Sequence, residues 1–440
     1  MRPALALVLI LAGAAGCAGS HPPVAAAPSA FAMPEAGPRS REAFRSALAA
    51  YDEAVARGAS ATELEARVDQ IAALAAQRDA HVSRLYWLTD LDAAKAEAQR
   101  THRPILSLRM LGRLDEEWSC ANSRFFRTTL YSNPAVAAYL REHFVLHWSS
   151  ERPAPKMTID FGNGHRVVRT VTGNSIHYVL DANGRVVDAL PGLYAAEAFV
   201  GALREAEALA VSNANKDDRA AEAAVMAAHQ RLLGEADARF AALAAAANRA
   251  DLRLPPPIVR LNPPPAPPAG VAVNVAMPKA VVERPLVAAV VPQAPAMPGV
   301  MDFTDDDVPG FEKVPWSSVA RTYAPHLDPT SLALMRSKSP RDWSGVYGPR
   351  PGKAPGVLDD RRFSAMVGAF ERKLAEDTLK NDLGVRSVIH AFLAAAPGTS
   401  LEKLNEWVYS TLFLTPASDP WLGLLPPGAY TGLPDDGLVR

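Results

Sequence analysis

The sequence predicts an α/β domain over residues 86–212, within a longer chain whose other folded parts are helical. Two observations favour this fold. Four short runs rich in apolar and β-branched residues, each of strand length, occur between residues 105 and 192. The segments between and after these runs carry apolar residues at helical spacing. The chain has 440 residues, which is long enough for two or three domains of roughly 150 residues each.

The composition excludes several classes of protein. The formal net charge is -1 and 21% of the residues are charged, so no basic excess favours a nucleic-acid partner. The two cysteines, Cys17 and Cys120, cannot build a disulfide-stapled fold. The sequence contains no phosphate-binding loop, no haem motif and no paired cysteines for zinc, so we expect no cofactor and no metal.

The first 16 residues have the layout of a secretory signal peptide. A single early positive charge precedes a short apolar run and small residues, and the run is too short to span a membrane. The four residues ending at Cys17 read AAGC and resemble the bacterial lipobox, which implies lipidation of Cys17. An ordinary signal peptide is the alternative. Ala18 is not the aspartate of an inner-membrane retention signal, so we expect a lipoprotein of the cell envelope, facing the periplasm and held at the outer membrane.

Composition and the spacing of apolar residues indicate how the rest of the chain is divided into segments. Ser40 and Ser60 are suited to begin two helices, and Gly58 is suited to end the first. Proline, alanine and valine dominate the stretch before residue 303, which favours an extended chain without a core. The segments that we expect outside the α/β domain are a flexible tether (17–39), a helical hairpin (40–85), a helix (213–253), a Pro/Ala-rich linker (254–302) and a helical C-terminal domain (303–440).

Inside residues 86–212 the expected order is helix, strand, helix, strand, hairpin, helix. The expected strands are 105–110, 144–148, 175–181 and 185–192. Asp181 to Gly184 form a tight connection between the last two strands. The stretch between the second and third strands is expected to be irregular, with a turn at FGNG.

This order resembles the thioredoxin-like superfamily, especially its secreted members. The resemblance rests on Trp87, Ala94, Ala98, Arg103 and Pro104, which lead into the first strand, and on the closing hairpin YVLDANGRVVDALPG. It covers the segment 86–212 and implies a central mixed four-stranded sheet flanked by helices. The C-terminal half resembles no family that we recognise.

Cys120 is the candidate nucleophile. It follows a strand and an acidic turn and stands at the start of an expected helix, where backbone N–H groups and the helix dipole favour a thiolate. The superfamily uses Cys-x-x-Cys, but here Ser123 stands in the second position, so no intramolecular disulfide can form. A single-thiol exchange remains, with Arg124 stabilising the thiolate and Ser123 donating a hydrogen bond.

The resemblance also indicates a substrate surface. The position of the family's cis-proline falls on Ser175, which we expect to have a trans peptide bond, and Trp118 lies just before the cysteine. Shifting the alignment by one residue puts Ser119 and Asn122 in the two cysteine positions. An inert, buried thiol is therefore the alternative to a reactive one.

Three further side chains are candidates for a polar cluster on the sheet. Arg109, His147 and His177 fall on expected strands, and they form either one such cluster or a polar sheet face whose groups are paired structurally.

Two hypotheses for function follow. The first is a thioredoxin-like envelope lipoprotein with single-cysteine thiol/disulfide exchange at Cys120, acting on a protein thiol. The second is a non-catalytic thioredoxin-like scaffold whose C-terminal helical domain binds a protein partner in the envelope. Both place the chain at a membrane through its N-terminal lipid, and neither involves nucleic acid.

Overall fold

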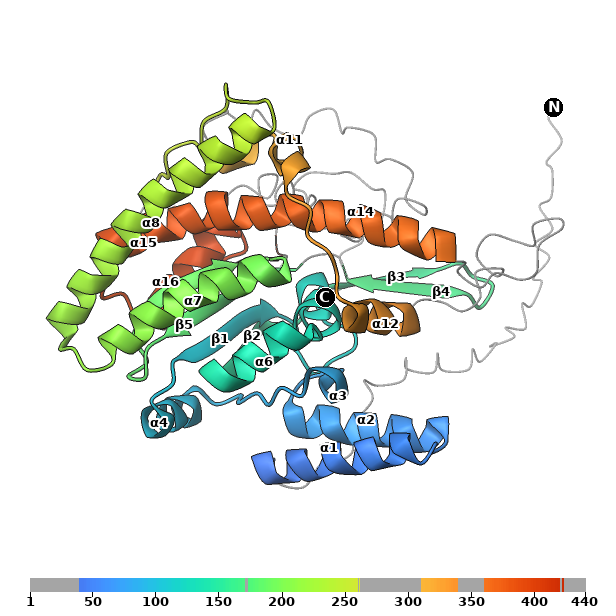
Figure 1. Ribbon diagram of the computed structural model, residues 1–440. Helices are drawn as coiled ribbons and strands as arrows, with labels where there is room; N and C mark the ends of the chain where they lie inside the picture. Colours follow the sequence, from blue (N-terminus) through green and yellow to red (C-terminus); the bar gives the residue numbers. More distant parts are fainter. Residues whose placement is uncertain are drawn as a thin grey trace, which may run out of the picture. The chain divides into compact units, whose positions relative to one another are not determined.

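The computed structural model describes residues 39–170, 173–259, 261, 310–338, 360–419 and 422 (Figure 1). The expected signal peptide, the lipidation site Cys17, nearly all of the tether and most of the Pro/Ala-rich linker lie outside these residues. Among the residues that the structure describes, no helix combines the length and the apolar character that crossing a bilayer requires.

The N-terminal segment is a helical hairpin, as the sequence predicts. Helix α1 (Arg41–Ala56) packs against α2 (Ala61–Ala75), and the short α3 (Ala80–Ser83) follows. The hydroxyl groups of Ser40 and Ser60 each accept a hydrogen bond from a backbone N–H in the first turn, so both serines cap as expected. The hairpin buries a small apolar core of its own.

A mixed four-stranded sheet lies at the centre of the structure. Its strands are β1 (Ile105–Leu111), β2 (Val145–Arg152), β5 (Ser175–Leu180) and β6 (Val186–Pro191), in the order β2-β1-β5-β6. β1 and β2 are parallel, whereas β5 is antiparallel to both β1 and β6. The four expected strands, their hairpin and the α/β class are therefore confirmed.

Helices cover this sheet, and Figure 1 shows α6 and α7 lying over it. The parallel connection from β1 to β2 runs through helices, which is how a crossover between parallel strands is normally made. The helices of this part are α4 (Leu91–Thr101), α5 (Ala121–Phe125), the π-helix η1 (Phe126–Leu130), α6 (Pro134–His143), α7 (Ala196–Asn213) and α8 (Asp218–Ala246).

The expectation of an irregular stretch after the second strand is wrong. This stretch forms an antiparallel ribbon of β3 (Lys156–Asp160) and β4 (Arg166–Thr170), which extends away from the central sheet in Figure 1. Side chains alternate between exposed and partly buried along β3, because the ribbon has no second layer to cover it. The FGNG turn lies at its tip, as expected, with Gly162 and Gly164 at positive φ.

The residues described after 309 (310–338, 360–419 and 422) are mainly helical. Among their segments three are short and two are π-helices, which are rare and often lie near functional sites. The elements are η3 (Gly310–Lys313), α11 (Trp316–Val319), η4 (Ala320–Thr322), α12 (Pro329–Lys338), α14 (Asp360–Leu379), the π-helix η5 (Lys380–Val385), α15 (Arg386–Ala395), α16 (Leu401–Trp407) and the π-helix η6 (Val408–Leu412).

These C-terminal helices share one hydrophobic core with the sheet. α15 packs against the edge strand β6 and against α8. On one sheet face the Tyr178 hydroxyl donates to Asn405 of α16, at 3.2 Å. On the other face the ring of His177 lies 5.0 Å from that of Phe199 in α7. The sheet is therefore covered on both faces and along its β6 edge.

The expected polar cluster of Arg109, His147 and His177 does not exist. Strand register pairs Ser107 with His147 and Leu108 with His177, so the two histidines point to opposite faces of the sheet. His147 Nδ1 lies 2.9 Å from Ser107 Oγ, and His177 Nε2 lies 2.6 Å from the Tyr131 hydroxyl. Both histidines are buried and each has a hydrogen-bond partner, which favours the alternative of structurally paired groups, although His177 Nδ1 has no partner.

The shared core predicts that damage to α15 destabilises the sheet. Ile389 is fully buried in this core, so we expect Ile389→Ala to lower the free energy of unfolding by about 2–5 kcal/mol. Hydrogen exchange of β1 should accelerate together with that of α15. Met366→Ala, at an exposed position of α14, is the control and should change the stability by at most about 0.5 kcal/mol. Unchanged exchange in β1 would show that the sheet has an independent core.

The burial of His177 leads us to expect that the folded protein becomes less stable in acid. Burial lowers its pKa to about 3, against roughly 6.5 in an unfolded chain. The neutral ring thus stabilises the fold above pH 6.5, and this contribution falls as the pH drops towards 3, by up to about 1.4 kcal/mol per pH unit. We expect His177→Gln to flatten this part of the stability curve in urea titrations at several pH values. His165→Gln, in the exposed β3–β4 turn, should leave the curve as it is.

Candidate functional site

Cys120 stands at the N-terminus of α5, as the sequence predicts. Its backbone is extended, and its Sγ accepts a hydrogen bond from the N–H of Ser123 at 3.4 Å. The thiol therefore acts as the helix cap, in the place where serine or aspartate is usual.

The Cys120 side chain is fully buried, with 0% of its surface exposed. Burial raises the pKa of the thiol, and the opposing contributions of the Ser123 N–H and the Arg124 guanidinium do not offset it. At neutral pH the group is therefore a protonated thiol, which is a weak nucleophile.

Two segments cover the sulfur. A Cβ placed on Gly173 would lie 3.0 Å from the Cβ of Cys120 and 3.4 Å from its Sγ, so the backbone before β5 packs directly on the thiol. Residues near η6 cover this segment in turn. The Tyr409 hydroxyl lies 3.5 Å from the carbonyl of Asn174, and the Asn174 amide donates to Thr415 Oγ1 at 2.9 Å. An attacking disulfide would have to displace both layers.

The side chains of Ser123 and Arg124 form hydrogen bonds within the protein. Ser123 is fully buried, and its hydroxyl donates to the carbonyl of Arg113 at 3.3 Å. Arg124 donates to Thr170 Oγ1 at 2.9 Å, and its charge favours a thiolate at Cys120 only as a minor contribution. The structure thus brings these three residues together as expected, but in a closed environment.

Ser175, at the position of the family's cis-proline, is also inaccessible to a substrate. Ser175 is fully buried, and its hydroxyl accepts a hydrogen bond from the Asn122 amide at 2.8 Å. Its backbone carbonyl accepts from the N–H of Gly192 at 2.8 Å. No cis peptide bond occurs among the described residues, which agrees with the expected trans bond at Ser175. An extended thiol substrate cannot pair with this backbone in the observed conformation.

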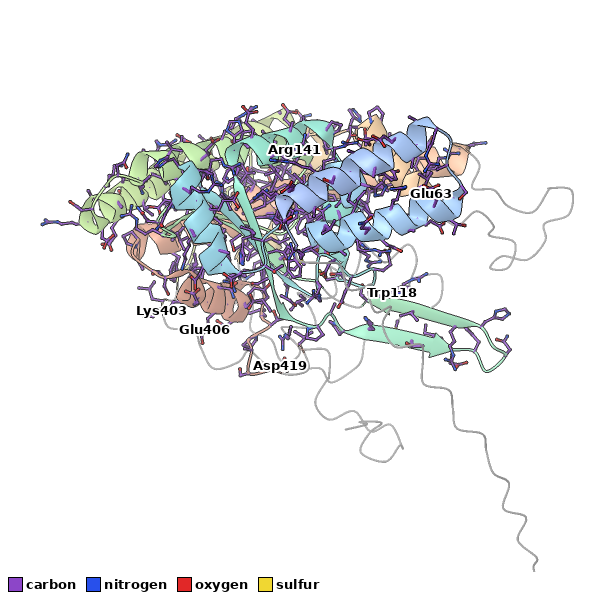
Figure 2. All side chains as sticks on the ribbon, turned by 90° about the horizontal axis from the view of Figure 1, so that it is seen from below. Glu63, Trp118, Arg141, Lys403, Glu406 and Asp419 are labelled. Atoms are coloured by element: carbon purple, nitrogen blue, oxygen red, sulfur yellow. The ribbon has the colours of Figure 1, made fainter. Side chains whose placement is uncertain are left out.

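Trp118 differs from the other candidates because it is exposed. The structure leaves 44% of its surface accessible, and Figure 2 shows it at the edge of the body. The loop that carries it lies beside the base of the β3–β4 ribbon, where the N–H of Gly112 donates to the carbonyl of Arg152 at 2.7 Å. Trp118 and Ser175 therefore do not form one accessible surface.

A cavity of about 310 Å³ lies on the other side of the Asn122–Ser175 pair. Its volume is at the lower end of the range for small-ligand sites. Three aromatic side chains, several aliphatic ones and a group of charged residues surround it. The lining residues are Asn122, Ser175, Gly192, Leu193, Phe311, Glu312, Val314, Pro315, Trp316, Ser317, Lys373, Glu376, Asp377, Lys380, Asn381, Val385, Leu412 and Phe413.

The cavity has a fixed wall where β6 ends and η5 begins. Gly192 has a φ of +72°, and a Cβ at this position would lie 2.6 Å from the side chain of Asn381. The Asn381 amide donates to the carbonyl of Leu193 at 2.9 Å, so this close approach holds the two segments together. The charges near the wall are paired, with Lys380 bound to Glu312 and Lys373 bound to Glu376.

Sequence reasoning did not find this cavity. Its residues come from six separate stretches of the chain, and no short motif joins them. The sequence indicates Asn122 only as an alternative position for one of the two cysteines. The two π-helices at its border would have been a signal, but i→i+5 hydrogen bonding leaves no pattern in the sequence.

Comparisons of the chain with known protein families, with curated proteins and with solved structures found no match.

The buried thiol predicts slow alkylation. In a Cys17→Ser chain, where Cys120 is the only thiol, we expect native protein at pH 7 to react with a thiol reagent on the order of a hundredfold more slowly than denatured protein. The reason is that the sulfur is covered and its pKa is raised. The measurement is the rate of mass increase under native and denaturing conditions. Rapid labelling of the native protein would contradict a closed site.

Proposed function

We propose that this protein is a non-catalytic thioredoxin-like scaffold of the cell envelope, anchored by a lipid on Cys17, that binds a protein partner through its C-terminal helices. The observation that carries the proposal is the burial of Cys120, which is fully covered and in the protonated state. The region where a thioredoxin-like enzyme would bind its substrate serves here as a packing surface.

The topology supports the thioredoxin-like part of the proposal. A strand, a helical crossover, a parallel strand, an antiparallel hairpin and a closing helix follow one another, and the strand order is β2-β1-β5-β6. This is the element order on which the resemblance rests. Cys120 lies directly after the first of these strands and begins the next helix. Cys120 thus lies where the resemblance predicts the first cysteine. The second cysteine, the cis-proline and an opening from the thiol to solvent are missing.

The single-thiol reaction has weaker support. A mixed disulfide would require Cys120 as a thiolate in contact with a bulky substrate. Burial opposes ionisation, and the Asn122–Ser175 hydrogen bond occupies the polar groups next to the sulfur. Exchange would therefore depend on rare opening of the cover around Gly173 and Tyr409.

The cavity supplies a site for a partner within the described residues. Phe311, Trp316 and Phe413 line its wall, and they suit an apolar side chain inserted by a partner segment. Lys373 and Glu376 beside it supply both signs of charge at hydrogen-bonding distance from each other, 2.9 Å, where polar groups flanking the inserted side chain can pair. The proposed partner is a protein with an accessible apolar anchor between polar residues.

Affinity capture from detergent-solubilised envelope tests this proposal with the whole chain as bait. Ser317 lines the cavity and is exposed, so Ser317→Trp blocks the cavity with little effect on the core. We expect this variant to retain less than roughly a tenth of the partner that the wild type captures, because a lost anchor contact costs more than about 1.4 kcal/mol.

Two variants control the experiment. Ser212→Trp adds the same side chain at an exposed position of α7 outside the cavity, and it should capture the partner normally. Cys120→Ala should also capture it, because the scaffold needs no thiol. Capture that depends on Cys120 and is released by a reducing agent would support the thiol reaction and overturn the scaffold. Equal capture by Ser317→Trp and the wild type would exclude the cavity.

A further inference from the structure

Three ionisable side chains meet where the C-terminal helices contact the edge of the sheet. Asp188 belongs to β6, His229 to α8 and His390 to α15, and all three are at most 3% exposed. One potential ligand atom from each residue lies within 4.8 Å of those from the other two. These residues are distant from Cys120 in the sequence, and neither the thiol nor the proposed partner site makes use of them.

The orientation of His229 is that of a metal ligand. Its Nε2 lies 2.9 Å from the carbonyl oxygen of Val187, to which it donates its proton. The Nδ1 lone pair then points at the cluster, 2.8 Å from Nδ1 of His390. Histidines that bind metals commonly donate their other ring N–H to a backbone carbonyl, which fixes the ring.

The carboxylate is also held in place. The guanidinium of Arg386 donates to Asp188 Oδ2 at 2.5 Å, and the N–H of Ala189 donates to Oδ1 at 2.7 Å. Oδ1 lies 3.8 Å from Nδ1 of His390. The buried ion pair with Arg386 supplies the opposite charge that a buried carboxylate requires.

We propose that Asp188, His229 and His390 bind a divalent transition-metal ion, and that this ion is Zn²⁺. Two imidazole nitrogens and a carboxylate oxygen are zinc ligands, with bond lengths near 2.0–2.2 Å, and a tetrahedral site places its ligand atoms roughly 3.3 Å apart. Two of the three separations between ligand atoms, 2.8 and 3.8 Å, lie on either side of this value, and the third is at most 4.8 Å, so the side chains must move closer together to bind the ion. A water molecule completes the tetrahedron.

The local charge is compatible with a cation. Asp188 and Asp382 both contact Arg386, so this buried trio carries one net negative charge. Arg239 also binds Asp382, at 2.7 Å, but its side chain is 55% exposed and its charge is screened by solvent. The alternative is a metal-free network in which the two imidazoles hydrogen-bond to each other.

The site would join three elements that are far apart in the chain. A metal ion held by β6, α8 and α15 ties the C-terminal helices to the sheet edge, and its binding free energy adds to the stability of the folded chain. The inference does not depend on the proposed function, since it concerns the sheet edge and not the Cys120 region.

Metal analysis of the full chain tests the site. Protein purified without chelator should contain roughly one zinc ion per chain by mass spectrometry of the elements. Removal with a chelator should lower the melting temperature, and added Zn²⁺ should restore it. The chelator-treated chain should bind Co²⁺ with the visible absorption bands of a tetrahedral site. Because these measurements use the wild type, they do not depend on whether a variant folds.

Variants then assign the ligands. His229→Gln and His390→Gln should each weaken Zn²⁺ binding by at least about tenfold in titrations of the chelator-treated chain. His326→Gln removes an exposed histidine and should bind like the wild type. Two results would overturn the proposal: a wild-type chain that takes up neither Zn²⁺ nor Co²⁺, or binding that both glutamine variants retain in full. Uptake of a different metal in preference to zinc would refute the assignment to Zn²⁺.

Discussion

The packing of the C-terminal helices against the central sheet is the interaction on which the other features depend. Tyr178 and Asn405 join one sheet face to α16, and Asp188 and Arg386 join the sheet edge to α15. β6 is an edge strand, and such strands expose unpaired backbone groups that need cover. His229 satisfies one of them by donating to the carbonyl of Val187. The helices therefore complete a sheet that would otherwise have an open edge and an open face.

The same packing decides the chemistry of Cys120. A cysteine at the start of a helix gains a lower pKa from backbone N–H groups only while the thiolate stays solvated. Here η6 and the backbone at Gly173 remove the water, and the cost of desolvating a charge exceeds the contribution of one N–H at 3.4 Å. Position in the fold and reactivity are thus separate properties, and the second depends on a segment almost 300 residues further along the chain.

The sequence predicts those features that depend on neighbouring residues. The caps at Ser40 and Ser60, the hairpin turn at Asp181 to Gly184 and the four central strands all follow from local patterns, and the structure has them. The β3–β4 ribbon was missed because its strands are only five residues long and β3 buries no side chain fully, so the sequence signal is weak. The cover over Cys120, the Asn122–Ser175 pair and the grouping of Asp188 with His390 could not be predicted, because they depend on contacts between distant segments.

The sheet edge and the cavity are mechanically connected through η5. This π-helix lines the cavity with Asn381 and Val385, and α15 begins at the next residue, Arg386. The contact of Arg386 with Asp188 therefore fixes the end of η5, while Asn381 fixes its start against Leu193. A segment held at both ends forms a rigid wall, and a rigid wall lowers the entropy lost when a partner binds. The ionic cluster at the sheet edge thus holds one end of a segment that lines the cavity.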